Sequence, residues 1–169
     1  LDWSPVLTWD ANITAEGINP DIILADLPGA LSGKLSSQGS LPEDRLNTEV
    51  KIDDLKGQLR GYALTASGGA AYQDGALSVP GVHAAVGRTT LELKGTVQEQ
   101  LALALQLNSP DLQEVLPQLA GSLQVKADVQ GAKQQPAINV ELQGTDIAYA
   151  GNRIERLAGR AQGVWKEQA

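Results

Sequence analysis

The sequence predicts a mainly β protein: a long, curled and partly open sheet with a hydrophobic concave face and one or two very short helices. Apolar and polar residues alternate with a period of two through most of the 169 residues, as in strands with one apolar and one polar face. Leu-x-Gly recurs at irregular spacing, for example at 55–57, 93–95 and 142–144, which favours strands laid side by side over a regular solenoid. The chain contains three Trp, three Tyr and no Phe, although large aromatic side chains usually fill closed cores.

Individual strands follow from this alternation, and Gly in the Leu-x-Gly sequences is expected to ease the curvature where strands enter the sheet. We expect about ten to thirteen strands of about 7–11 residues, given the usual lengths of strands. The clearest alternating segments, in chain order, are 7–16, 46–53, 90–94, 101–107, 122–130 and 137–143.

Gly, Pro and Asp mark the turns between these strands. Asp74-Gly75 is a strong two-residue hairpin signal. We expect breaks also at 66–72 (ASGGAAY), 79–82 (VPGV) and 130–136 (QGAKQQP), because Gly accepts positive φ and Pro cannot donate to a central ladder.

Two similar stretches, NPDIILADLPGAL at 19–31 and SPDLQEVLPQLAGSL at 109–123, are the predicted helices. Asn19 and Ser109 stand at the N-cap positions, each followed by Pro at the first helical position. A second Pro limits each helix to about two turns. We therefore predict one β-rich segment over 1–169 that contains two loosely repeated strand–short helix–strand units, at about 7–54 and 101–163.

Composition excludes several classes of function. The net charge is −7 and the 13 Lys and Arg are scattered, which argues against nucleic acid and against electrostatic docking on anionic lipid surfaces. No apolar run approaches the roughly 18 residues of a spanning helix. Cys is absent, so disulfides and thiolate metal sites are excluded. Because the chain has no Met, we expect it to be an internal segment of a longer protein.

No pattern of catalytic or metal-binding residues stands out, so we predict no enzyme activity, no metal site and no cofactor. His83 is the only histidine, and Glu43-Asp44 and Asp53-Asp54 are interpreted as solvated acids at strand ends. The alternative is an enzyme or a carbohydrate-binding β domain, which would use His83 or the tryptophans Trp3, Trp9 and Trp165.

The most informative feature is the aliphatic face that the alternation creates. Two sheets could close on each other as a sandwich around it. We favour an open trough lined by Leu, Ile, Val and Ala, which could shelter acyl chains at about 0.8 kcal/mol per buried CH₂ and let them slide. The predicted lining residues are Ile13, Leu46, Val50, Ile52, Leu91, Leu93, Leu103, Leu105, Leu107, Leu123, Val125, Val129, Ile138, Val140 and Leu142.

The blocks SPDLQEVLPQLAGSLQVKADVQG at 109–131 and PAINVELQGTDIAYAGNRIERLAGRAQG at 136–163 resemble the AsmA-like family. Within it, the order and density of the Leu-x-Gly strands are similar to the C-terminal part of the inner-membrane subunits of translocation and assembly modules. The resemblance extends over essentially the whole chain.

This resemblance implies a periplasmic segment of a protein that is held in the bacterial inner membrane by one helix outside the segment and reaches toward the outer membrane. It implies a TamA-like outer-membrane barrel partner. It also implies two roles: conduction of phospholipid between the membranes, and support for the assembly of outer-membrane β-barrel proteins, including autotransporters. An alternative is a chaperone-like surface that binds unfolded outer-membrane strands by β-augmentation without lipid transport.

Overall fold

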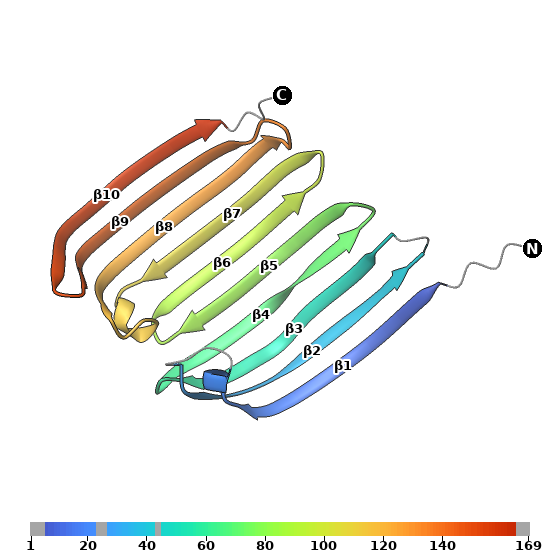
Figure 1. Ribbon diagram of the computed structural model, residues 1–169, viewed down its shortest axis with the longest axis horizontal. Coiled ribbons are helices and arrows are strands. Elements are labelled where there is room, and N and C mark those ends of the chain that lie inside the picture. Colours follow the sequence, from blue (N-terminus) through green and yellow to red (C-terminus); the bar gives the residue numbers. More distant parts are fainter. Residues whose placement is uncertain (1–5, 23–26, 43–44, 165–169) are drawn as a thin grey trace, which may run out of the picture.

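Ten strands form a single antiparallel sheet in the order of the chain, from β1 at one edge to β10 at the other (Figure 1). The computed structural model describes residues 6–22, 27–42 and 45–164. The sheet is not closed, as predicted, because β1 and β10 lie at its opposite edges. The strands are β1 (Leu7–Ile18), β2 (Gly29–Leu41), β3 (Asn47–Leu59), β4 (Tyr62–Gln73), β5 (Ala76–Val86), β6 (Thr89–Val97), β7 (Gln100–Ser109), β8 (Leu119–Ala132), β9 (Ala137–Tyr149) and β10 (Asn152–Val164).

Turn chemistry explains the tight hairpins. Asp74 and Gly75 adopt φ angles of 48° and 82° between β4 and β5, which is the two-residue turn that the sequence predicts. The breaks expected at 66–72 and 79–82 are wrong, because these segments continue β4 and β5. Pro80 is accommodated at a bulge between Val79 and Val82, where a proline does not interrupt a regular ladder.

The two predicted helices are found as 3₁₀ turns. η2 (Leu112–Glu114) is a single 3₁₀ turn rather than about two turns of helix. η1 (Pro20–Ile22) is a 3₁₀ turn followed by residues 23–26, which lie outside the described part of the chain. Asp111 caps η2, since its Oδ1 accepts from the backbone N–H of Gln113 at 3.1 Å, whereas the predicted cap Ser109 is the last residue of β7. The Oδ1 of Asn19 accepts from the N–H of Asp21 at 3.2 Å, as an N-cap does. The equivalence of units 7–54 and 101–163 stays a prediction.

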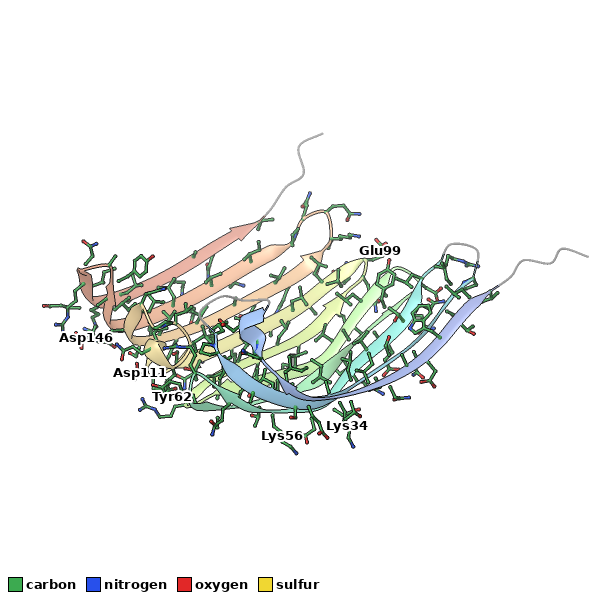
Figure 2. All side chains as sticks on the ribbon, turned by 60° about the horizontal axis from the view of Figure 1, so that its bottom comes forward. Lys34, Lys56, Tyr62, Glu99, Asp111 and Asp146 are labelled. Carbon is green, nitrogen blue, oxygen red and sulfur yellow. The ribbon has the colours of Figure 1, made fainter. Side chains whose placement is uncertain are left out.

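The sheet is curled, and Lys34 and Lys56 lie on its convex side (Figure 2). Glycines on the concave side allow neighbouring strands to approach closely. A Cβ at Gly95, whose φ is +143°, would collide with the backbone carbonyl of Ala102 on β7. Of the Leu-x-Gly glycines, Gly29 and Gly121 lie at or near the starts of β2 and β8, as expected, whereas Gly57 and Gly95 lie near the ends of β3 and β6.

The molecule has one layer, so the sandwich alternative is not adopted. In the described part of the chain, only Leu59, Val79 and Leu112 are buried hydrophobic residues. Ten strands fall within the expected number, although they reach 14 residues and are longer than predicted. Most aliphatic side chains therefore lie on an accessible face of the sheet instead of in a core.

Candidate functional site

The candidate site is the concave face, and its register can be followed across all ten strands. Directly paired residues on antiparallel strands project from the same face. Starting from Ile13 on β1, successive pairs lead through apolar residues and glycine alone to the far edge of the sheet. This first row is Ile13, Leu35, Ile52, Gly68, Val82, Leu93, Leu105, Ala127, Val140 and Ala161.

A second complete row lies beside the first. It too crosses the sheet from β1 to β10 without a polar or charged side chain. Together the two rows form an apolar band about 43 Å long, at roughly 4.8 Å between neighbouring strands. The second row is Ala15, Gly33, Leu55, Ala66, Ala84, Leu91, Leu107, Val125, Leu142 and Gly159.

The opposite face is polar and charged. One convex row joins His83 to Glu92, Gln106, Lys126 and finally Glu141. Glu141 also forms an ion pair with Arg160 of β10 at 2.5 Å. Because the two faces differ so sharply, an apolar ligand has a single side of the sheet on which to bind.

The predicted lining residues that lie in strands all project from the concave side, and Leu46 lies just before β3. The side chain of Ile13 is 53% exposed and that of Leu46 is 42% exposed. The predicted lining residues between Ile52 and Leu142 are half-buried. The face is thus accessible to solvent along its length. Their role as a ligand-binding surface stays a prediction.

Sequence reasoning missed several members of the two rows. Leu55 escaped because the bulge at Asp53-Asp54 places it three residues after Ile52, which breaks the period of two. Val82 follows the bulge at Pro80 in the same way. The Ala and Gly members of the rows differ little in hydrophobicity from the polar residues beside them. In the sequence, only their positions relative to the Leu-x-Gly segments could have suggested them.

One long side of the sheet carries the connections β1–β2, β3–β4, β5–β6, β7–β8 and β9–β10, and both short helices lie there (Figure 1). We call this side the lipped rim. The segment around η2 is fastened to the β5–β6 turn by Glu114, whose Oε2 accepts from the backbone N–H of Arg88 at 2.7 Å and whose Oε1 accepts from its Nε at 2.8 Å. The Arg60 guanidinium adds a bond to the carbonyl of Gln113 at 3.0 Å.

Electrostatics strengthen this attachment. The hydrogen bond from the Arg88 side chain, followed by the one from its backbone N–H, lowers the pKa of Glu114 below the usual range of a glutamate. The Arg88 guanidinium, in turn, has a raised pKa because of Glu114. The Glu114 side chain is 4% exposed, so its charge depends on these bonds for solvation.

The concave face is covered where it meets the η2 segment. The hydroxyls of Thr89 and Ser109 form a buried 2.8 Å hydrogen bond on that face, and Leu112 of η2 is buried nearby. Near η1, the backbone N–H of Arg60 donates to the carbonyl of Pro28 at 2.7 Å, and Leu59 is buried.

The other long side carries the connections β2–β3, β4–β5, β6–β7 and β8–β9; we call it the open rim. No helix lies there among the described residues 45–164. Arg45, Leu46, Tyr72, Asp74 and Gly75 line an open hollow at this rim, and the Tyr72 side chain remains accessible. The two rims of the face are therefore built differently.

Those residues considered for catalysis that the structure describes do not assemble into a site. His83 lies on the convex face beside Glu92, with 3.7 Å between Nδ1 and Oε1. Asp53 and Asp54 lie inside β3 at its bulge, not at a strand end as predicted. Glu43, Asp44, Trp3 and Trp165 fall outside the described residues, and Trp9 donates from Nε1 to the Ser37 hydroxyl at 3.1 Å. The described residues contain no group of three or more His, Cys, Asp or Glu placed to hold a metal ion.

Among the described residues, the helices are too short and too polar to cross a membrane. The family model for the N-terminal domain of TamB matches residues 1–169, the whole chain. The chain belongs to the TamB family. That model describes an N-terminal domain, which differs from the C-terminal position suggested by the sequence resemblance.

A curated relative agrees with the TamB assignment. The translocation and assembly module subunit TamB of Haemophilus influenzae is 25% identical over 158 residues, or 93% of this chain. The chain spans 12% of the length of that TamB protein. No solved structure matches the chain.

Proposed function

We propose that this TamB-family segment is a non-enzymatic, groove-forming part of a translocation and assembly module, and that its concave face conducts phospholipid acyl chains between the inner and outer membranes. The observation that carries the proposal is the pair of uncharged rows that cross all ten strands. A closed core would not need such continuity, whereas a conduit requires it.

Energetics support an apolar cargo. Each CH₂ group moved from water onto the face contributes up to about 0.8 kcal/mol if it becomes fully buried. Because the rows repeat the same Leu, Val, Ile and Ala chemistry from strand to strand, a chain displaced by one strand finds nearly the same surroundings. Net attraction with small local differences favours sliding over tight binding at one position.

The wider role rests on family membership. We infer that the segment lies in the periplasm, that a membrane anchor elsewhere in the protein holds it at the inner membrane, and that the module pairs it with a TamA-like barrel in the outer membrane. In this proposal, the module supports assembly of outer-membrane β-barrel proteins, including autotransporters. Direct contact between these residues and the barrel is not required by the geometry.

A second candidate is a chaperone-like surface without lipid transport. It is favoured by the edges of the sheet, because within the described residues β1 and β10 each pair on one side alone. An unfolded outer-membrane strand could add to such an edge by backbone hydrogen bonding. A proline in β1 or β10 would then abolish client binding, whereas changes on the concave face would have little effect.

Site-specific photo-crosslinking in the intact protein distinguishes the two candidates. A photoreactive residue replaces Leu105, Val125 or Leu142 on the concave face, and Gln106, Gln124 or Gln143 next to each serves as its convex control. Phospholipid adducts at the concave positions alone are expected for the conduit. Adducts with barrel proteins that are lost when a proline is placed in β1 or β10 would instead support the chaperone-like surface, and a concave face without any adduct would contradict the conduit.

A further inference from the structure

We propose that the groove is one-sided: a bound phospholipid keeps its head group at the open rim, and the lipped rim between η1 and η2 is closed to it. This inference rests on the proposed phospholipid conduit and specifies the orientation of its ligand. The two rims of the apolar face carry the argument, because they differ in cover, in attachment and in exposure.

Several polar groups of the lipped rim around η2 are already engaged with one another. Glu114, the most buried acid there, uses both carboxylate oxygens on Arg88. The guanidinium of Arg88 is further engaged by Asp111 at 3.4 Å, and the Thr89 and Ser109 hydroxyls bond to each other. A phosphate would have to break these bonds before it could be held at this position.

Two buried aliphatic side chains also lie at this rim, Leu112 in η2 and Leu59 at the end of β3. They are 7% and 8% exposed, so the concave face ends at this rim in packed aliphatic side chains. An acyl chain can end against such a surface, whereas a charged head group there would lose its hydration without compensation. Beside the β9–β10 turn, by contrast, Tyr149 is 57% exposed.

The open rim presents the opposite arrangement. Its β4–β5 turn at Asp74-Gly75 is tight, and Tyr72 is 37% exposed next to the hollow lined by Arg45. Glu99 projects at the same rim (Figure 2), and Lys133 lies in the neighbouring β8–β9 turn. Solvated charges of both signs suit a zwitterionic head group that remains in water while its acyl chains lie on the apolar rows.

The orientation can be tested with two photoreactive phosphatidylethanolamines, one carrying its diazirine in an acyl chain and one on the head group. Full-length protein is reconstituted with each probe in phosphatidylethanolamine–phosphatidylglycerol vesicles, and adducts are located by peptide mass spectrometry. Tail adducts are expected on β7 and β8 of the concave face. Head-group adducts are expected at 72–76, 98–100 and 132–135, with background yield at 87–89 and 109–116.

Different results would contradict the phospholipid conduit and the one-sided orientation of the lipid. Absence of tail adducts on the concave face would overturn the conduit itself. Tail adducts together with equal head-group labelling of both rims would overturn the one-sided orientation alone.

Releasing the lip provides the matched variant. Arg88→Gln removes the side-chain bonds to Glu114 and Asp111, and head-group adducts should then appear at 87–89 and 109–116. Arg153→Gln is the control, because Arg153 forms an ion pair at the same rim, with Asp146, away from η2. Unchanged head-group labelling in Arg88→Gln, with tail labelling retained, would show that the lip does not orient the lipid.

Discussion

Arg88 and Glu114 hold together two segments that are 26 residues apart in the chain. Both oxygens of the buried carboxylate accept from the same arginine, one from its backbone N–H and one from its Nε. This contact keeps the β7–β8 connection folded over the β5–β6 turn. Four predictions concern this attachment and the face that it borders.

The first prediction is an acid-sensitive lip. Because Arg88 lowers the pKa of Glu114 in the folded protein, the stabilisation is complete above the unfolded glutamate pKa of about 4.3 and is lost as the pH falls through the lower folded value. Amide exchange at 109–116, corrected for its intrinsic pH dependence, should lose protection below about pH 4. Glu114→Gln should lower protection already at neutral pH and remove this acid transition, whereas Glu141→Gln on the convex face should retain it. Persistence of the transition in Glu114→Gln would assign it to another group.

The second prediction concerns the Thr89–Ser109 hydrogen bond. Thr89→Val leaves the Ser109 hydroxyl buried without its partner, and should lower the free energy of unfolding by about 1–3 kcal/mol. The double variant Thr89→Val/Ser109→Ala should recover part of this loss, since neither polar group remains. Pulse proteolysis of the full-length protein in urea, followed by detection of peptides from this segment, measures the change. Additive losses in the double variant would contradict coupling between the two hydroxyls.

The third prediction tests the close approach of β6 and β7. Gly95→Val should destabilise the segment by about 1–3 kcal/mol, because it forces a side chain into a strained backbone conformation and against the carbonyl of Ala102. Gly163→Val is the matched control: a Cβ there meets no atom within 4 Å, and Gly163 lies on the edge strand β10, where it pairs with Ile138 of β9. The same proteolysis assay should show little change for the control. Equal effects of the two substitutions would contradict the steric explanation.

The fourth prediction separates folding from passage along the face. Val125→Asp places a carboxylate on an accessible apolar surface, where we expect a cost of about 1 kcal/mol instead of the several kcal/mol of an unpaired charge in a closed core. Protease resistance should therefore be retained while phospholipid crosslinking at Leu105 and Leu142 is lost. Gln124→Asp, on the neighbouring convex position, should change neither measurement. Unfolding of Val125→Asp would indicate that the face is covered in the intact protein.

Several elements could be predicted because their causes are local. Alternation from Leu123 to Val129 specifies a strand with one apolar face, and Asp74-Gly75 specifies a hairpin, since both depend on neighbours in the chain. The short helices were predicted at the right places, but η2 was predicted with too many residues. Their length depends on how each connection meets the next turn, as when Asp111 replaces Ser109 as the cap of η2.

The sequence by itself determined a β segment with an aliphatic face, few aromatic residues and no evident catalytic centre, because composition and a period of two act within single strands. Tertiary structure alone decided which residues align across ten strands. Bulges at Asp53 and Pro80 shift the period locally and bring Leu55 and Val82 onto the apolar rows. It also decided that the two rims differ, because Arg88 reaches Glu114 through a contact between distant segments that no local pattern encodes.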